Sequence, residues 1–541
     1  MPRCKNLTCI ANYYMRRFII ITIILLIATV AITVVYFKKL RTTGLHTDET
    51  MRAIPDNAAL VFEFNNDNGF YDIFTGNKLF AAVVGKQQID ELDTLRSQLL
   101  TNSPLQKFFN GQNIFVSLHP LKDHTVQLLI TIAADKGFDV TDIDKLPGQS
   151  NKSLLVTPVT FSGKKGYILY SGILKKRFYL LNKEDGIYEG SFSKELIEQS
   201  AQYAPQKDKK LFLMLPDQQN ANSLANLYVN YNHLNPLFDA LFKNKNTDIF
   251  KSFKLLPALA ALNLNFKNDA LMFTGFSNIQ YDQPLAYLNL FANQQPVANH
   301  LKDIFPSTTA YSISFAVSDP KKFKSDLSDW YAKAKLQNEK DSIFTKVTKE
   351  TGVNLIAEFN RVLGNEFAIV TTRYMEKYAI IALSNGSLFK PVMKNISNMT
   401  TDDIGELNYS KLPFFLLGDA FRIFHHPWFM IVDNYLILAN TESELKSYYD
   451  SYFNRKFQSK LQQYNQFNDL VAEKSNVAWF INFKNSEPIL KQDLSDSFYK
   501  NFNENETGWK SFYAASYQLI ASDKNFYTSF CMNLNQTDNQ P

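Results

Sequence analysis

Residues 55–64 read PDNAALVFEF, and residues 306–315 read PSTTAYSISF. Each segment begins with a proline and runs into alternating apolar positions, the pattern of a half-buried β-strand. Placed side by side, the apolar positions of one strand face coincide, Leu60, Phe62 and Phe64 with Tyr311, Ile313 and Phe315. The two segments predict that the chain builds the same strand twice.

Further segments recur in the same order, about 250 residues apart. The matched pairs are Gly111 with Ile114–Val116 and Gly364 with Phe367–Ile369, Val126–Ile132 and Tyr378–Leu383, Phe178–Leu181 and Trp428–Ile431, the helix starts Ser193–Leu196 and Glu442–Leu445, Leu211–Met214 and Trp479–Phe483, and the turns Asn268-Asp269 and Ser522-Asp523. A preserved order at a nearly constant offset indicates an internal duplication. A repeat this long is a domain or half-domain, because solenoid modules have periods of about 20 to 50 residues.

An apolar run without charge, proline or glycine spans residues 18–37. At about 1.5 Å per residue it reaches about 30 Å, the thickness of a hydrocarbon core. It is longer than the apolar part of a cleaved signal peptide, so we expect a retained transmembrane helix. Basic residues flank both ends. Because no second span of that length follows, we place the short N-terminal tail in the cytoplasm of a bacterium and the large C-terminal domain in the periplasm.

The predicted fold class is α+β: one N-terminal transmembrane helix, then two duplicated antiparallel-sheet units with packed helices. The expected boundaries are a cytoplasmic tail at 1–17, the transmembrane helix at 18–37, a juxtamembrane linker at 38–53, a first unit with a helical insertion at 54–300, and a second unit at 301–541. The true start is left open between Met1 and Met15, and in the second case residues 1–14 are an upstream start-site artefact.

Helix signals punctuate both units. Lys86–Leu100 carries isoleucine and leucine along one stripe. Asp319-Pro320 supplies an N-cap and a first-turn proline, and Thr441 with Glu444 fits a capping box. Two more helices with apolar faces are predicted over Ser223–Phe242 and Leu285–Leu301.

The net charge of +5 belongs to the N-terminal region. Residues 1–52 hold eight basic and two acidic residues, which leaves 49 basic and 50 acidic residues for the remainder. Such a balanced domain lacks the overall bias of a nucleic-acid binder, and we predict no nucleic-acid partner. A local basic cluster, Lys207, Lys209 and Lys210, is interpreted as a solvated turn.

No catalytic, cofactor-binding or metal-ligating residue is predicted. The chain lacks a phosphate-binding Gly-Lys-Ser/Thr loop, a Gly-x-Ser-x-Gly elbow, His-Glu-x-x-His and Cys-x-x-Cys. The side chains that could form a site are assigned ordinary roles. His119, Asp123 and His124 are placed in a polar turn, His425-His426 in a loop, Asp402, Asp403, Glu195 and Glu198 at the surface, and Cys531 in the core of a strand.

Aromatic residues make up 14% of the chain and fall mainly in alternating runs. An aromatic-rich core accounts for them, and an aromatic-lined groove is the alternative. Such a groove would place Phe178, Leu180, Trp428 and Met430 between the units.

Residues 54–62, which read IPDNAALVF after the apolar run, and the block Trp428–Tyr448 resemble a family of bacterial membrane-anchored extracytoplasmic proteins. The resemblance implies an N-terminal span, a Pro-x-x-Ala entry to the first outer strand, and a later strand, turn, strand and helix. It implies no activity, because the family has none assigned.

The sequence thus predicts a single-pass protein of the bacterial inner membrane that contacts the bilayer through residues 18–37. Its outer domain is expected to be non-catalytic and to bind another envelope protein or act as a scaffold. Two alternatives stay open: lipid or glycan binding in a groove between the units, and an enzyme with a dispersed site.

Overall fold

The structure is a computed structural model that describes residues 49–535, except 102–104, 122–124, 136, 139–142, 144–153, 185, 205–222, 244–257, 268, 280–285 and 505–507. The predicted transmembrane helix at 18–37 lies outside the described residues. Within the described part, none of the helices combines the length and apolar character needed to cross a bilayer.

In the described part of the chain, twenty strands of differing length form one antiparallel sheet. We call residues 60–279 the first half and residues 309–534 the second half. The strands of the first half are β1 Leu60–Asn65, β2 Asn113–Pro120, β3 Val126–Ala133, β4 Leu154–Phe161, β5 Lys164–Ser171, β6 Lys176–Glu184, β7 Ile187–Ser191, β8 Ala225–Asn230, β9 Ala258–Phe266 and β10 Ala270–Ile279. Those of the second half are β12 Thr309–Ala316, β13 Leu363–Thr372, β14 Lys377–Leu383, β15 Ser397–Met399, β16 Ile404–Leu407, β17 Trp428–Val432, β18 Tyr435–Ala439, β20 Val477–Asn482, β21 Phe512–Ser522 and β22 Asn525–Leu534. A separate two-stranded sheet pairs β11 Val297–Ala298 with β19 Lys474–Ser475.

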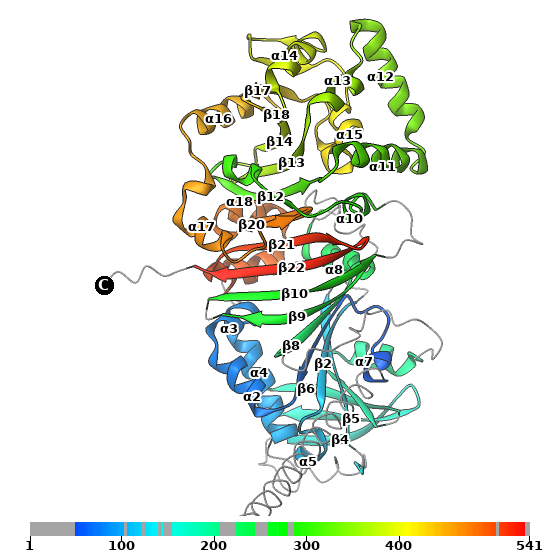
Figure 1. The fold of residues 1–541 in the computed structure, drawn as a ribbon. Helices are drawn as coiled ribbons and strands as arrows, with labels where there is room; N and C mark the ends of the chain where they lie inside the picture. Colours follow the sequence, from blue (N-terminus) through cyan, green and yellow to red (C-terminus); the bar gives the residue numbers. More distant parts are fainter. Residues whose placement is uncertain are drawn as a thin grey trace, which may run out of the picture.

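The two halves pair their strands in the same order. Across the first half, neighbours follow the order β4, β5, β6, β7, β3, β2, β1, β8, β9, β10. Across the second half the order is β15, β16, β17, β18, β14, β13, β12, β20, β21, β22. The halves meet where β10 pairs antiparallel with β22, and Figure 1 shows these two strands side by side at the middle of the sheet.

The strand pairs within each half show which residues of the two halves are equivalent. Phe62 faces Val116 as Ile313 faces Ile369, and the next pair along the strands, Phe64 with Ile114, corresponds to Phe315 with Phe367. The predicted match of β1 with β12 therefore holds in register.

Three of the predicted matches need correction. Ser193 caps α7 as Thr441 caps α16, so the helix starts correspond with a shift of one residue from the predicted match of Ser193 with Glu442. Tyr179 pairs with Ser191 as Trp428 pairs with Ala439, so β6 and β17 correspond with a shift of one residue from the predicted alignment. The place of β20 is taken in the first half by β8, whereas Leu211–Met214 lies outside the described residues. Short apolar strands carry too little pattern to set a register by sequence alone.

Helices cover the sheet in both halves. In the first they are α2 Asn68–Gly76, α3 Lys78–Val84, α4 Lys86–Arg96, α5 Gln106–Phe109, α7 Lys194–Gln202 and α8 Leu234–Leu241. Between the halves and in the second they are α10 Asn289–Ala292, α11 Pro320–Lys333, α12 Gln337–Thr351, α13 Leu355–Val362, α14 Gly386–Asn395, α15 Leu412–Leu417, α16 Glu442–Phe453, α17 Gln462–Asn468, α18 Phe483–Asp493 and α19 Asp496–Asn503. Figure 1 places α2 to α4 beside the first half, and α11 to α15 at the opposite end of the molecule.

Three helix predictions are confirmed. α4 begins at Lys86, and a π-helical turn extends it to Thr101. The Asp319 carboxylate caps α11, and Thr441 with Glu444 forms the capping box of α16.

Two helix predictions are wrong. Within Ser223–Phe242 the first part is strand β8, because it pairs with both β1 and β9, and only Leu234–Leu241 is α-helical. Of the predicted Leu285–Leu301, residues 286–301 are described, and within them the only α-helix is the four-residue α10. Pro296 accounts for the second error, since the residue before a proline is driven out of the helical region.

One hydrophobic cluster runs along the helix-covered face of both halves and across β10. On the opposite face, α7 packs against the first half and α16 against the second, each with its own cluster. A third cluster there includes Met51, Ile54 and Ala58, so the segment that enters β1 is packed into the domain.

Candidate functional site

The helix-covered face of the first half borders a partly open cavity of about 400 Å³. One wall consists of side chains from β1, β2, β3, β6, β7 and β10. The other consists of side chains from α2, α3, α4 and α5, together with Leu99, Leu105, Phe138 and Ile143. Almost all of the lining is aliphatic or aromatic, so the cavity suits an apolar occupant.

The side chains of β1 and β2 on the cavity face are less buried than those on the opposite face. Phe62, Phe64 and Val116 line the cavity and remain partly accessible. Their chain neighbours Val61 and Phe115 point to the opposite face and are fully buried. Because side chains alternate along a strand, the accessible positions form one continuous wall.

The equivalent positions in the second half are filled. Ile313, Phe315 and Ile369, which correspond to Phe62, Phe64 and Val116, are all buried. Phe291 of α10 stacks on Phe315 with ring centroids 5.1 Å apart, and Phe323 of α11 lies 5.4 Å from Phe291. The cavity on this side of the second half measures only about 20 Å³.

The volume of the first cavity, about 400 Å³, lies within the range of small-molecule sites, about 300 to 1,000 Å³. Because the lining is almost wholly apolar, an occupant with an apolar body would gain contacts there.

The lining has few polar groups. Tyr71 of α2 lies with Asp93 and Arg96 of α4, and Tyr188 of β7 is the fourth residue with a polar side chain. The Arg96 guanidinium lies 3.5 Å from the centroid of the Tyr71 ring and donates to Asn68 Oδ1 at 3.0 Å. Burial raises the pKa of Tyr71 to about 12, so its hydroxyl stays protonated at neutral pH.

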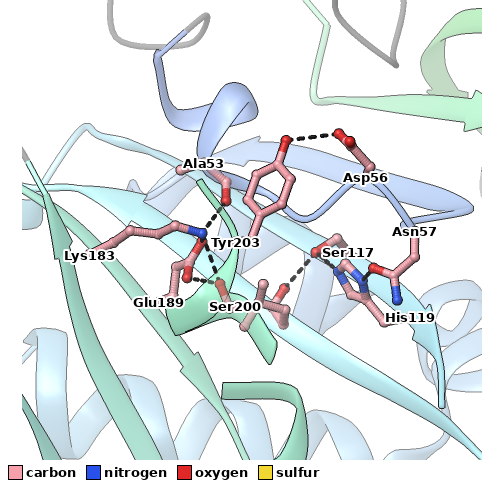
Figure 2. A network of polar contacts seen from close by, with 10 residues as sticks. Ala53, Asp56, Asn57, Ser117, His119, Lys183, Glu189, Ser200 and Tyr203 are labelled. Carbon is pink, nitrogen blue, oxygen red and sulfur yellow. Dashed lines mark hydrogen bonds and ion pairs between the residues drawn. The ribbon is translucent and has the colours of Figure 1, made fainter. Parts of the chain in front are cut away.

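A network of buried polar groups occupies the opposite face of the first half (Figure 2). Lys183 Nζ donates to Ala53 O at 2.7 Å and to Ser200 Oγ at 3.0 Å, and it lies 3.3 Å from Glu189 Oε1. Ser200 also hydrogen-bonds to Glu189, and Tyr203 donates to Asp56 at 2.8 Å. Burial raises the pKa of Glu189, and the nearby Lys183 ammonium opposes that rise.

A serine, a histidine and an asparagine extend this network in the geometry of a nucleophile relay. Ser117 Oγ lies 2.8 Å from His119 Nε2, and His119 Nδ1 lies 2.8 Å from Asn57 Oδ1. A relay of this kind needs a reachable nucleophile and a base whose pKa lies near the working pH. Ser117 and His119 are fully buried and do not line the large cavity. Burial lowers the pKa of His119 to about 3, so the ring is neutral and serves as a structural hydrogen-bonding group.

The network holds the segment that leads into β1. Its partners Ala53, Asp56 and Asn57 all belong to that segment, as Figure 2 shows. Lys183 is the extra residue of a β-bulge in β6, and the equivalent strand β17 has no bulge. In the second half the positions of Ser117, Glu189 and Ser200 are taken by apolar or aromatic side chains, Val370, Ile437 and Tyr448.

Comparison with known proteins assigns no family. No family model matches the chain, and no curated protein matches it. Among solved structures the chain is similar to TP0453 in its crystal form III. The TM-score is 0.24, the sequences are 9% identical, and the match covers 46% of this chain and 89% of that chain. A TM-score this low does not establish a common fold.

Most of the side chains considered from sequence lie where expected. Cys531 is buried in β22, where burial raises the pKa of its thiol to about 12. His425 and His426 lie in an exposed loop. The exposed acidic pairs are Asp402 with Asp403 and Glu195 with Glu198. The described part of the chain contains no group of three or more potential metal ligands.

Other expectations need correction or stay open. His119 lies in strand β2 and not in a turn, because it is the buried partner of Asn57. Asp123, His124 and the cluster Lys207, Lys209 and Lys210 lie outside the described residues.

The aromatic groove was predicted in the wrong place. Phe178 and Leu180 line the large cavity, but Met430 belongs to the cluster under α16 on the opposite face. The cavity therefore lies within the first half, and the junction between the halves is the paired ladder of β10 and β22. The accessible aromatic positions could not have been distinguished by sequence, since Phe64 and the packed Phe315 are the same residue type.

We expect cavity-filling substitutions to separate the two halves. Val116→Phe should change the free energy of unfolding by less than about 1 kcal/mol, because the larger ring enters existing space. The matched variant Ile369→Phe should cost about 1 to 3 kcal/mol, because it overpacks a filled site. Denaturant midpoints of the full chain measure both, and equal losses would contradict the assignment of the cavity.

The neutral state of His119 predicts a pH dependence. The unfolded histidine takes up a proton near pH 6.5 and the folded one only near pH 3, so stability should fall as the pH is lowered through this window. His119→Gln should reduce this fall by up to a few kcal/mol, while His425→Gln, at an exposed position, should leave it unchanged. A histidine NMR titration that places the pKa of His119 near 6.5 would refute the structural role.

Proposed function

We propose that this chain is a membrane-anchored binding protein that holds the hydrocarbon chain of an amphiphile in the cavity of its first half. The observation that carries the proposal is a cavity of about 400 Å³ with an apolar lining, at positions that are packed solid in the second half. The compartment, the anchor at residues 18–37 and the absence of a nucleic-acid partner form part of the proposal.

The lining favours a hydrocarbon chain over a glycan. A sugar carries hydroxyl groups that need partners once they are removed from water, and an unpaired buried hydroxyl costs about 1 to 3 kcal/mol. Of the described lining residues only Tyr71, Asp93, Arg96 and Tyr188 have polar side chains, and the first three lie together on two helices. A ligand with a long apolar chain and one polar end matches this arrangement of lining residues.

We also propose that the two halves arose by duplication and then diverged in role. Support comes from the identical strand order and from the register of β1 and β2 with β12 and β13. In this account the first half binds the ligand. The second half, whose helix-covered face is packed, is the scaffold and the surface for another envelope protein.

Binding should depend on chain length. For the full chain held in amphipol, the affinity for alkyl carboxylates should rise about fourfold per added methylene until the cavity is full, and then level off. Competition against a fluorescent apolar probe measures this. Val116→Phe should lower the affinity of the longest ligands, whereas Leu155→Phe, at an exposed position of β4, should not. Affinities that do not change with chain length would refute the proposal.

The proposed topology has its own test. Protease added to spheroplasts should digest the domain that follows residue 38, while intact cells should protect it. Recovery of the native polypeptide in the cytosolic fraction would overturn the anchor and the compartment together.

A further inference from the structure

A row of exposed side chains crosses the outer strands of the first half. Leu155 of β4 pairs with Tyr170 of β5, and Tyr170 pairs with Arg177 of β6. Leu155 is 62% exposed and Tyr170 is 37% exposed, whereas their chain neighbours Leu154 and Leu169 are buried in the cluster on the cavity face. Because side chains alternate along a strand, the row lies on the face opposite the cavity.

The turn between β5 and β6 extends this row to one edge of the sheet. Ile173 in the turn is 62% exposed, and Lys175 beside it is also exposed. Lys176 pairs with Glu91 of α4 at 2.6 Å. Exposed apolar side chains bordered by basic ones are typical of surfaces that enter the headgroup region of a membrane. We call Leu155, Tyr170, Ile173, Lys175 and Arg177 the hairpin patch.

The hairpin patch belongs to the first half alone. On the same face, α7 covers a part of the strands further from the turn, where Phe161 and Leu181 are buried with Leu196. In the second half the connection equivalent to this turn, between β16 and β17, contains helix α15. Figure 1 places β4 and β5 at the end of the molecule opposite α11 to α15. The patch is therefore separate from the half that is proposed to contact another envelope protein.

The cavity opens at the same edge of the sheet. Strands β3 and β6 both pair antiparallel with β7, so both begin at the edge where β7 ends. Leu128, near the start of β3, lines the cavity and is 43% exposed. A ligand that enters past Leu128 therefore arrives from the edge that carries the hairpin patch.

The proposed anchor keeps this edge near a bilayer. The apolar run ends at residue 37, and the described domain begins at Glu49. A fully extended chain over residues 38–48 spans at most about 40 Å. The tether thus holds the domain close to the surface of the membrane that contains the anchor.

We infer that the hairpin patch docks on the surface of this bilayer, at lipids with anionic headgroups. The inference rests on the anchor and the cavity of the proposed function. Leu155 and Ile173 enter the headgroup region, and Tyr170 lies at its level, where tyrosine is enriched in membrane proteins. Lys175 and Arg177 pair with lipid phosphates. Docking places the open end of the cavity beside the lipid, so the bilayer supplies the amphiphile.

The test measures lipid contact at Ile173 in the full chain. Ile173→Cys carries an environment-sensitive fluorophore, with Cys4→Ser and Cys9→Ser in the same chain and Cys531 buried. The chain is reconstituted in nanodiscs of phosphatidylcholine, with or without phosphatidylglycerol, and doxyl-labelled lipid is the quencher. We expect strong quenching with phosphatidylglycerol and weak quenching without it. The same label on Tyr374→Cys, a turn position of the second half that is 61% exposed, should stay unquenched.

Charge variants show whether the basic side chains hold the patch on the lipid. Lys175→Gln with Arg177→Gln should lower the docking equilibrium about fivefold for each charge removed. Lys175→Arg with Arg177→Lys should retain docking, because both charges remain. The control Lys333→Gln with Lys349→Gln makes the same change of net charge at exposed positions of α11 and α12, and it should leave the quenching unchanged.

The outcomes separate this inference from the proposed function. An unquenched label at residue 173 in a chain that has entered the nanodiscs refutes docking on lipid and leaves a protein as the partner of this edge, while the apolar site keeps its own binding test. Quenching that does not change with phosphatidylglycerol or with the charge variants refutes the anionic lipid. If the full chain does not enter the nanodiscs, the proposed anchor fails, and this inference fails with it.

Discussion

The pairing of β10 with β22 is the constraint on which the rest of the structure depends. Eight residue pairs join these strands, so two sheets of the same strand order become one. A continuous ladder fixes how the two halves are joined, because a slip of one position would turn every side chain of one strand to the opposite face. The pairings within each half, such as β1 with β2 and β12 with β13, show which residues correspond. The difference between the halves is therefore a difference in what covers and fills equivalent positions.

The two faces of the sheet differ between the halves in different ways. On the helix-covered face, the second half inserts Phe291 against Phe315, whereas the first half leaves Phe64 lining a cavity. On the other face, the second half buries Ile437, whereas the first half buries Glu189 with Lys183. A buried ion pair adds little net stability, but its geometry is specific. Its contact with Ala53 fixes the segment that leads from the proposed anchor into β1.

Much of the fold could be predicted from sequence. Alternation at Leu60–Phe64 and Tyr311–Phe315, and the capping residues Asp319 and Thr441, report local structure, because they depend on neighbours in the chain. Ser223–Phe242 was misassigned, because pairing of β8 with β1 and β9 outweighs helical periodicity. The site depends on partners distant in sequence. Nothing in the local pattern shows that Phe64 lines a cavity, or that His119 meets Asn57 instead of solvent.

The most direct test of this account is a crystal structure of the full chain equilibrated with xenon, which enters dry apolar cavities. We expect density for xenon or for a retained hydrocarbon chain between α2 to α4 and the face that carries Phe62 and Phe64, and none at Ile313 and Phe315. A structure in which α2 to α4 pack directly onto Phe62 and Phe64, with no density between them, would contradict the central claim.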